Sequence, residues 1–458
     1  MDKIISLTKR RGFIFPGSEI YGGLANTYDY GPLGVEILRN IKNIWWDFFV
    51  NKRENIFGLD TNILMNPKVW EASGHTSSFN DVVLDCKDCK TRNRVDHLIE
   101  DYFQNKGKEV KVEGLKIEDL ENIINREKIK CPNCQGFNWA KPKKFNLLFE
   151  TRVGIISEEK SLVYLRGEIA QGMFVNFRNV LNSLSPKLPF GLAQSGPAFR
   201  NEITLGKLTF RTLQFNLSEF EYFFDAEKMS WKDQFNYWKD EMWKWTRDVL
   251  GLKEENLRWR VHSDEERSFY SQRTEDIEYK YPWGFKELYG IAYRTDYDLK
   301  NHMEKSGVDL RYYDSESKRK FIPHVIEPTF GMDRSLLAIL FDCYFEDSEK
   351  KRVVLKIKPN LAPYKIAVFP LLANKPDLVV EARKIFEKLS LKYPCLWDDR
   401  GNIGKRYFSQ DEIGTPWCVT VDFKTLEDGS VTVRDRDTTK QERVLIDSLG
   451  RYFQERLG

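Results

Sequence analysis

Charged and aromatic side chains gather in one stretch of the sequence, from Phe190 to Phe224. Two runs of strand-forming residues flank the turn-prone segment Ile203–Lys207, which predicts an antiparallel hairpin with a longer loop. Because side chains alternate between the faces of a strand, several are expected to share one face of this hairpin. They are Arg200, Glu202, Phe215, Leu217, Glu219 and Glu221. A face that carries so many charges is not expected to be packed core.

These side chains suit a planar ligand that carries phosphate groups. The Arg200 guanidinium can bind two phosphate oxygens at once. The Phe215 ring can stack on a base, and the carboxylates can hold an amine or a metal ion. The spacing alone equally allows a solvated, charged sheet face with an incidental Phe.

The same stretch resembles motif 2 of class II aminoacyl-tRNA synthetases. Phe199-Arg200-Asn201-Glu202 and Phe210-Arg211-Thr212 to Phe215 carry the resemblance, which is closest to the dimeric bacterial glycyl-tRNA synthetases. It implies that Arg200 binds the α-phosphate of ATP and that Phe215 stacks on adenine. It implies further ATP contacts from Asn201, Glu202, Phe210 and Arg211. Leu213-Gln214 stands where the family usually has Arg-Glu.

A carboxylate also stands where a strand gives way to a helix, in LVYLRGEIAQGMFVNFR from residue 162 to 178. From its position alone, Glu168 could complement the dipole at the start of the helix. The segment also resembles Arg-Pro-Glu-Thr-Ala-Gln-Gly of the family, whose Glu holds the amino group of glycine. Gly167 replaces Pro and Ile169 replaces Thr in this sequence, whereas Glu168 is present.

Two later segments complete the resemblance. In residues 283–299, Glu287 and Leu288 are implied to lie at the ATP site, with Glu287 as a magnesium ligand. Residues 323–345 resemble motif 3, in which a strand leads through Gly331 into an apolar helix. Such a junction can direct backbone groups and an Arg toward anions. The resemblance implies that Arg334 binds the γ-phosphate and that Gly331 and Asp333 also contact ATP.

The resemblance thus implies a catalytic set and a glycine site. The catalytic set is Arg200, Glu202 and Arg334. The glycine site is Arg94, Glu168, Phe215, Glu219, Arg294, Glu327 and Thr329. Arg92 is a near alternative to Arg94, and Arg294 could instead form a local ion pair in Arg294-Thr295-Asp296. His75, which follows a Gly in a polar loop, receives no catalytic role.

Two CxxC pairs indicate a metal site. Cys86 and Cys89 form the first pair and Cys131 and Cys134 the second, in a chain that has 7 Cys. Two thiolates at this spacing can bind one edge of a tetrahedral zinc ion, and four can complete it. Four reduced thiols on adjacent turns remain the alternative. We expect residues from about 86 to 145 to be an insertion, with any zinc structural.

An amphipathic helix is expected after Pro32, because Val35, Leu38, Ile41, Trp45 and Trp46 recur at near-helical spacing. Alone, this pattern indicates an ordinary helix that faces the core. Gly31-Pro32-Leu33-Gly34 resembles motif 1, whose helix forms the dimer interface in this class. The resemblance therefore implies a homodimer.

From about residue 366 the pattern changes to alternating strands and helices, which predicts an α/β domain. The segment IGKRYFSQDEIGTPWCVTVDF resembles the anticodon-binding domain of class IIa synthetases. The fold class expected is therefore α+β. It comprises an antiparallel-sheet class II catalytic domain over residues 1–350, with the insertion, and an α/β anticodon-binding domain over residues 360–458.

Composition excludes several other classes of protein. A hydrophobic content of 41% and an aromatic content of 14% indicate a packed globular chain. Apolar runs are too short to span a bilayer and the first residues lack the apolar centre of a signal peptide, so we expect a cytoplasmic protein without membrane contact. The basic excess lies at the carboxyl end, with 20 Lys and Arg against 15 Asp and Glu in residues 351–458. Neither a GxxxxGK[ST] loop nor a GxGxxG fingerprint is present.

The activity expected from the resemblance is that of a glycine–tRNA ligase. Its substrates would be ATP, glycine and tRNA(Gly), with Mg²⁺ as the ion that accompanies ATP. Two other classes remain open at this stage. One is a related enzyme that transfers an activated amino acid to something other than tRNA. The other is a catalytically silent scaffold or nucleic-acid accessory protein, which would be expected to lack Arg200, Glu202 or Arg334.

Overall fold

The computed structural model describes residues 1–108, 110, 112, 115–154, 161–202, 207–264 and 266–457. Its centre is a seven-stranded sheet with the order β11-β12-β13-β16-β10-β9-β3. The strands are β3 (Ile56–Gly58), β9 (Phe190–Phe199), β10 (Gln214–Phe224), β11 (Leu257–Val261), β12 (Arg273–Tyr281), β13 (Gly284–Thr295) and β16 (His324–Gly331). All neighbours are antiparallel except β3, which is parallel to β9. The predicted hairpin is β9 and β10; residues 203–206 of its loop lie outside the described residues.

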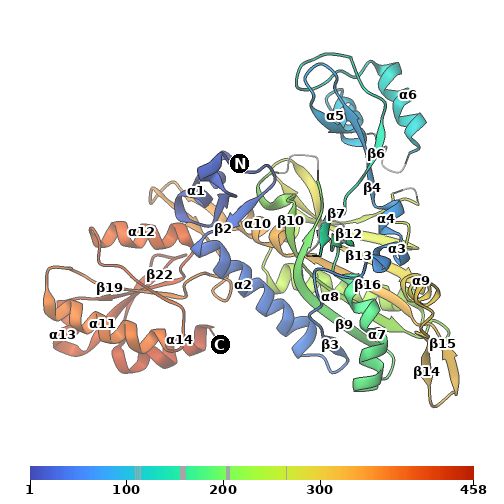
Figure 1. Ribbon diagram of the computed structural model, residues 1–458. Helices are drawn as coiled ribbons and strands as arrows, with labels where there is room; N and C mark the ends of the chain where they lie inside the picture. Colours follow the sequence, from blue (N-terminus) through green and yellow to red (C-terminus); the bar gives the residue numbers. More distant parts are fainter. Residues whose placement is uncertain are drawn as a thin grey trace.

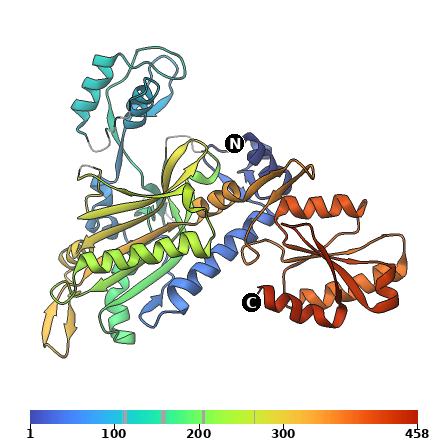
Figure 2. The ribbon, with the colours of Figure 1, turned by 180° about the vertical axis from the view of Figure 1, so that it is seen from behind.

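Helices cover both faces of this sheet (Figures 1 and 2). On one face α2 (Pro32–Trp46), α8 (Trp231–Lys244) and α10 (Met332–Cys343) enclose the largest hydrophobic cluster of the described residues. On the other, α7 (Ala170–Leu184) and α9 (Tyr297–Ser306) pack over a smaller cluster. Strand β10 contributes side chains to both hydrophobic clusters, since Phe220 and Tyr222 belong to the first cluster and Phe223 to the second. Glu219 and Glu221 therefore share the face that α7 covers.

Helix α2 confirms the expected amphipathic helix after Pro32, with one correction. Ile37, Ile41 and Trp45 are fully buried, but Val35 is 41% exposed. The core-facing stripe of a helix has room for only some of the apolar positions. In α2 that stripe runs through Leu33 and Ile37, which leaves Val35 outside it.

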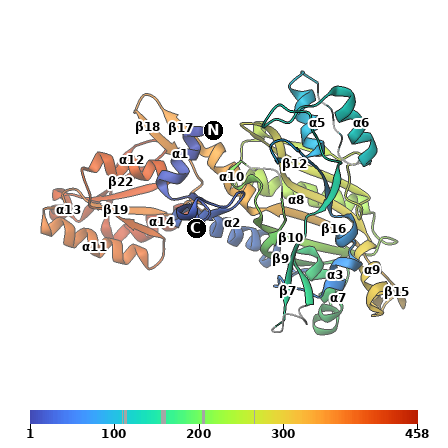
Figure 3. The same cartoon turned by 45° about the horizontal axis from the view of Figure 1, so that its top comes forward.

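The insertion forms a small unit of its own, which stands apart from the central sheet in Figures 1 and 2 and is turned toward the viewer in Figure 3. Strands β4 (Asn80–Asp85), β5 (Arg92–Arg94) and β6 (Lys143–Asn146) make a sheet with the order β5-β4-β6. Helices α5 (Val95–Gln104) and α6 (Ile117–Glu127) pack on it around Leu84, Ile99 and Ile124.

The C-terminal part has a five-stranded sheet with the order β20-β19-β21-β22-β23. Its strands are β19 (Ile366–Pro370), β20 (Cys395–Trp397), β21 (Trp417–Val421), β22 (Ser430–Asp435) and β23 (Gln441–Leu445). Its helices are α11 (Pro376–Ser390), α12 (Ile403–Ile413), α13 (Phe423–Asp428) and α14 (Leu449–Leu457). The parallel β20-β19-β21 core confirms the predicted alternation of strands and helices. β23 adds a strand at the edge that the sequence pattern did not reveal.

The remaining elements are short. They are α1 (Asp2–Arg11), α3 (Pro67–Ala72), α4 (His75–Ser78) and the strand pairs β1 (Ile14–Pro16) with β2 (Tyr28–Tyr30), β7 (Phe149–Val153) with β8 (Ser161–Leu165), β14 (Tyr312–Asp314) with β15 (Arg319–Phe321) and β17 (Tyr344–Asp347) with β18 (Arg352–Leu355). Of the helices in the described part of the chain, none is both long and apolar enough to cross a membrane.

Candidate active site

Four buried glutamates meet on the face of the central sheet that α7 covers. Glu219 and Glu221 come from β10, Glu327 comes from β16, and Glu168 stands just before α7. None of the four is more than 6% exposed. One carboxylate oxygen from each of Glu219, Glu221 and Glu327 lies within 4.8 Å of the other two. We call these three residues the carboxylate triad.

Arg294, at the end of β13, is the fully buried cation beside the glutamates. Its Nη1 donates to Oε1 of Glu327 at 2.7 Å, and its Nε and Nη2 donate to the two oxygens of Asp298 at 2.8 Å each. Nη2 is also 3.5 Å from Oε1 of Glu168, and the guanidinium lies 3.8 Å from the centroid of the Tyr270 ring. Arg294 therefore forms a local ion pair, but with Asp298 of α9 rather than with Asp296.

Glu168 has partners that the sequence pattern did not indicate. Nε2 of His75 is 3.2 Å from Oε2 of Glu168, and Nδ1 of His75 is 2.8 Å from Oγ of Ser73. His75 is 1% exposed, so the polar loop expected around it is packed against the site. Nε2 of Gln171 donates to both Oε1 of Glu168, at 2.9 Å, and Oδ1 of Asp298, at 2.8 Å. The amide of Gln171 thus ties Glu168 to the carboxylate that holds Arg294.

The glutamates differ in how readily they ionise. Burial raises the pKa of Glu219 well above its ordinary value, and the charges of Glu327 and Glu168 raise it further. Burial also raises the pKa of Glu327 to about 7, although the Arg294 charge opposes the rise. Burial opposes ionisation of Glu168 too, but there the charges of His75 and Arg294 prevail and hold its pKa below the ordinary value. The pKa values therefore differ because burial and like charges raise those of Glu219 and Glu327, whereas opposite charges lower that of Glu168.

Thr329 and a backbone amide complete the surroundings of Glu219. Oγ1 of Thr329 is 3.4 Å from Oε2 of Glu219, because the two residues are directly opposed across β16 and β10. The backbone N–H of Ile169 donates to Oε1 of Glu219 at 3.0 Å. The start of α7 is therefore fixed to the sheet through this carboxylate.

Arg200 lies on the open side of the same cluster, just beyond β9. Its Nε donates to the carbonyl oxygen of Gly167 at 3.0 Å. Its guanidinium carbon lies 5.1 Å from the ring centroid of Phe79 and 5.3 Å from that of Phe215. Its charge acts on both Glu219 and Glu287. Arg200 therefore stands between the glutamates and a second cation site.

Arg334 forms that second site, in the first turn of α10. Its Nη1 is 3.0 Å from Oε1 of Glu287, and its Nε donates to the carbonyl oxygen of Phe210 at 3.3 Å. Its guanidinium carbon lies 4.7 Å from the centroid of the Phe210 ring. The side chain also lies along Gly331, where an added Cβ would meet Arg334 carbons at 3.4 Å and beyond. Both Arg334 and Glu287 remain accessible, with side chains 21% and 50% exposed.

Full-length relatives of this chain carry one name. A glycine–tRNA ligase from Caldanaerobacter subterraneus subsp. tengcongensis is 51% identical over 460 residues, which cover 100% of this chain and 98% of the relative. A glycine–tRNA ligase from Clostridium acetobutylicum is 51% identical with the same coverage, and one from Acetivibrio thermocellus is 51% identical over 99% of this chain and 98% of its own length. This chain belongs to the glycine–tRNA ligase family.

Membership of the glycine–tRNA ligase family confirms the activity that the sequence resemblance implied. Residues 365–456 also match the family model described as an anticodon binding domain. The match spans the five-stranded C-terminal sheet and its helices. The expected C-terminal anticodon-binding domain is therefore confirmed, on a mixed α/β fold with a central antiparallel sheet.

For a glycine–tRNA ligase, the structure brings together most of the residues expected at the two substrate sites. The glycine set Glu168, Glu219, Arg294, Glu327 and Thr329 is contiguous. On the ATP side, Arg200 contacts Phe215, and Arg334 contacts Phe210 and Glu287. Arg211 lies near Glu202, with Nε 3.8 Å from Oε2, and the backbone N–H of Asn201 donates to Leu147.

Three residues that the ligase resemblance implies at the substrate sites have side chains with other partners in this structure. Leu288 is 1% exposed in the hydrophobic core, because a β-bulge between β12 and β13 turns both it and Tyr289 inward. The Asp333 carboxylate does not face the phosphate side: it accepts hydrogen bonds from the Tyr30 hydroxyl and from the backbone and side chain of Asn216. The backbone of Leu288 and Asp333 is the part of each residue that we expect to contact ATP.

Arg94 is the third of these residues. It stands at the N-cap position of α5 and pairs with Asp96, and its Nη1 is 3.3 Å from Oδ1 of Asp81. Burial raises the pKa of Asp81 to about 6 despite the Arg94 charge, and Glu202 contributes to the rise. Arg94 therefore belongs with the residues around Glu202 rather than with the carboxylate triad.

The four cysteines of the CxxC pairs converge in the insertion. Their sulfur atoms all lie within 4.8 Å of one another, and Sγ of Cys86 is 3.6 Å from Sγ of Cys134, as is Sγ of Cys89 from Sγ of Cys131. Tetrahedral zinc with Zn–S bonds of about 2.3 Å places sulfur atoms about 3.8 Å apart. The donor set and its spacing therefore fit a zinc ion, and all four thiols are free.

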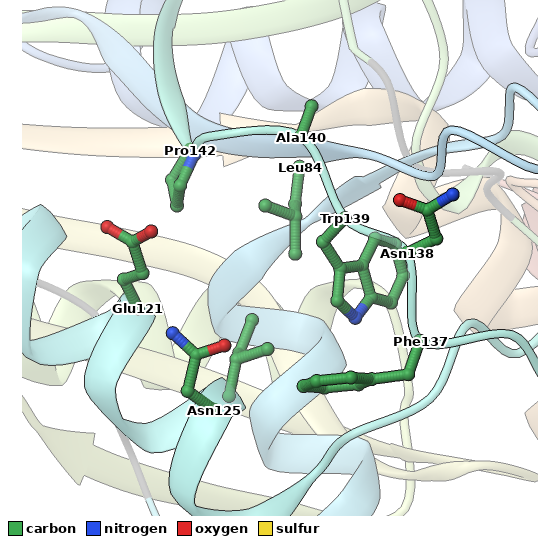
Figure 4. A pocket seen from close by; sticks show the side chains of 9 residues that line it. Leu84, Glu121, Asn125, Phe137, Asn138, Trp139, Ala140 and Pro142 are labelled. Atoms are coloured by element: carbon green, nitrogen blue, oxygen red, sulfur yellow. The ribbon is translucent and has the colours of Figure 1, made fainter.

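A separate pocket of about 180 Å³ opens at the insertion itself, between α6 and the segment from Phe137 to Pro142 (Figure 4). Glu121 and Asn125 line one side, and Phe137 and Trp139 the other. It contains none of the residues expected to bind ATP or glycine, so the active-site chemistry is located elsewhere.

Proposed function

We propose that this chain joins glycine to tRNA(Gly) in two steps that use ATP. In the first step a carboxylate oxygen of glycine attacks the α-phosphorus of ATP, which forms glycyl-adenylate and releases pyrophosphate. In the second, the terminal ribose hydroxyl of tRNA attacks the glycyl carbonyl and releases AMP. The observation that carries this proposal is that Arg200 binds the carbonyl oxygen of Gly167, the residue before Glu168 of the buried glutamates, and packs on Phe215.

The chemistry needs charge neutralisation and alignment more than it needs a nucleophile from the protein. Arg200 is placed to bind the α-phosphate, where negative charge builds up as the attack proceeds. Arg334 is placed to bind the far end of the triphosphate, and Phe215 to stack on the adenine. Glu202 belongs to the same catalytic set. No side chain is required as an obligatory general base in this scheme.

Magnesium fits the exposed side of the phosphate region. Glu287 offers a half-exposed carboxylate beside Arg334, and oxygen donors of this kind suit a hard cation. Glu287 would hold Mg²⁺ together with the ATP phosphates, and the ion would neutralise phosphate charge. Arg334, released from Glu287, would then be free to bind the γ-phosphate.

Selection of glycine is a matter of space around its α-carbon. A hydrophobic pocket distinguishes one methylene by only about 1 to 3 kcal/mol. In this site Glu219 and Glu327 would contact the ammonium group and Glu168 would add negative charge beside it, while Arg294 contacts both Glu168 and Glu327. A substrate held so firmly by its ammonium group has its α-carbon pressed against the wall formed by the start of α7, which excludes side chains.

The finer organisation follows from the same assignment. We infer a class II catalytic domain over residues 1–350 and an anticodon-binding domain over 360–458. Zinc held by the four cysteines would stabilise the insertion and take no part in catalysis.

We also infer a cytoplasmic homodimer. The loop before α2 exposes Ile20, Tyr21 and Leu24 by 61% or more, which is typical of a surface covered by a partner.

ATP–pyrophosphate exchange with a panel of amino acids tests the proposal. Exchange that depends on glycine and not on alanine or serine is expected, followed by charging of tRNA(Gly). Glu219→Ala should abolish exchange or raise the glycine KM while the protein stays folded. Glu278→Gln removes a buried carboxylate elsewhere on the sheet, where it pairs with Arg258, and serves as the control. Wild-type exchange in Glu219→Ala would refute the glycine site. Exchange without tRNA charging would favour a different acceptor.

A further inference from the structure

Glu221 is a buried carboxylate that is outside the glycine site implied by the resemblance and has no role in the proposed reaction. It is 0% exposed, and within the described part of the chain neither of its carboxylate oxygens has a hydrogen-bond partner. An unpaired carboxylate in such a place is costly. The other two members of the carboxylate triad each place an oxygen within 4.8 Å of one of its own.

The size of the triad fits an ammonium group. Three oxygens that lie within 4.8 Å of one another leave a central point at most about 2.8 Å from each, so a nitrogen at or just above that point is within hydrogen-bond distance of all three carboxylates. An ammonium group has three N–H donors, one for each carboxylate. Glu221 provides the innermost of these acceptors, two residues deeper along β10 than Glu219.

The charge around the triad does not balance when glycine is absent. The groups that face Glu221 are Glu219 on its own strand, Glu327 on β16, Arg294 on β13 and Asp298 on α9. The negative charge of Glu168 raises the pKa of the other two members of the triad, Glu219 and Glu327. Arg294 is already shared among Glu327, Asp298 and Glu168. Five buried carboxyl groups thus have one fully buried guanidinium among them, with His75 beside Glu168 and the partly exposed Arg200 acting on Glu219.

We propose that the carboxylate triad holds a proton in the glycine-free protein and exchanges it for the ammonium group of glycine. This inference rests on the proposed function. Glycine enters as a zwitterion, its ammonium group donates to the three carboxylates, and the proton held among them passes to solvent. No covalent bond other than the O–H bond of one carboxyl group is broken. Glu221 is in this account a residue that positions the ammonium group and sets the number of protons released.

The raised pKa values of the triad agree with this exchange. Burial and the neighbouring Glu327 raise the pKa of Glu221 well above its ordinary value. Glu327 itself titrates near pH 7, as burial raises its pKa to about 7. A proton is therefore available for release in the neutral range. Glycine affinity should rise up to about tenfold per pH unit below this pKa and level off above it.

Isothermal titration calorimetry of glycine into the full-length protein tests the exchange. Titrations at pH 6.5 to 7.5 in phosphate and in Tris, which differ in ionisation enthalpy, give the protons released per glycine. We expect release of about half to one proton in the wild type, little in Glu221→Gln, and wild-type release in the control Glu278→Gln. Glu221→Gln should also flatten the pH dependence of the glycine KM in pyrophosphate exchange without a matching change in kcat.

Each outcome of these titrations overturns a different part of the proposal. Glycine binding without proton release by the wild type overturns the exchange and leaves the proposed function intact. Wild-type release that persists in folded Glu221→Gln overturns the role of Glu221. A wild-type protein that neither binds nor activates glycine overturns the proposed function and the exchange with it. The wild-type titration remains decisive even if Glu221→Gln does not fold.

Discussion

Arg294→Lys is the substitution whose effect the structure defines most fully. Arg294 makes three charge-assisted hydrogen bonds, two to Asp298 and one to Glu327, with no exposure to solvent. Lysine keeps the charge, but its single ammonium group cannot reproduce the planar fork that reaches both carboxylates. It also loses the stacking on Tyr270.

The expected size of the effect follows from the hydrogen bonds lost. Lysine can reach one of the two carboxylates, so about two hydrogen bonds to charged groups disappear, each contributing about 1.5 to 3 kcal/mol. If the loss of about 3 to 6 kcal/mol falls on glycine activation, kcat/KM for glycine declines by about 10²- to 10⁴-fold.

Pyrophosphate exchange at saturating ATP and varied glycine measures this loss. Arg311→Lys is a matched control, because Arg311 makes the same two-pronged contact with Asp309 at 2.9 and 3.0 Å on the surface, where its side chain is 46% exposed. An exposed pair of this kind contributes about 0 to 1 kcal/mol. If Arg294→Lys kept kcat/KM within threefold of the wild type, the idea that Arg294 organises the glutamates would be refuted.

Three further predictions follow from the same geometry. Burial raises the pKa of Glu327 to about 7, above the value of about 4.3 for an unfolded chain. The glycine-free protein should therefore lose stability as pH rises from about 5 through 7. A thermal midpoint that rises over this pH range would contradict this prediction. Replacing Cys131 and Cys134 with Ser should abolish zinc binding, measured by atomic absorption, and leave glycine-dependent exchange within about threefold; loss of exchange in a folded variant would place the metal in catalysis. Asp333→Ala should lower the thermal midpoint, since it removes three hydrogen bonds of about 1 to 3 kcal/mol each, and leave the ATP KM within about threefold; a raised ATP KM with unchanged stability would return its carboxylate to the ATP site.

Local patterns in the sequence were sufficient to predict several of the elements that carry the site residues. The turn-prone segment between two strand-forming runs predicted the β9–β10 hairpin, and strand alternation placed Glu219 and Glu221 on one face. Glycine at a strand-to-helix junction predicted the position of Arg334 at the start of α10. Two CxxC pairs were sufficient to predict the cysteine cluster.

Burial of that face was not predictable from alternation. Charged side chains suggested a surface, whereas α7 covers Glu219 and Glu221 completely. Strand periodicity says which residues share a face but not which helix packs over it. The charges are tolerated there because Arg294, the backbone N–H of Ile169 and Thr329 supply partners.

The missed residues depend on contacts between distant parts of the chain. His75 meets Glu168 and Gln171 meets Asp298, pairs that lie far apart in sequence and on different elements. A single His after a Gly carries no local signal of such a contact. The burial of the Leu288 side chain was equally hidden, since one extra residue in a β-bulge reverses the alternation of side chains along β13.

A crystal structure with glycine and a non-hydrolysable ATP analogue tests the central claim most directly. The account predicts that the guanidinium groups of Arg200 and Arg334 both lie within hydrogen-bond distance of phosphate oxygens, and that the glycine nitrogen contacts Glu219 and Glu327. A nucleotide bound with either guanidinium directed away from it, or glycine bound outside the glutamates, would contradict the account.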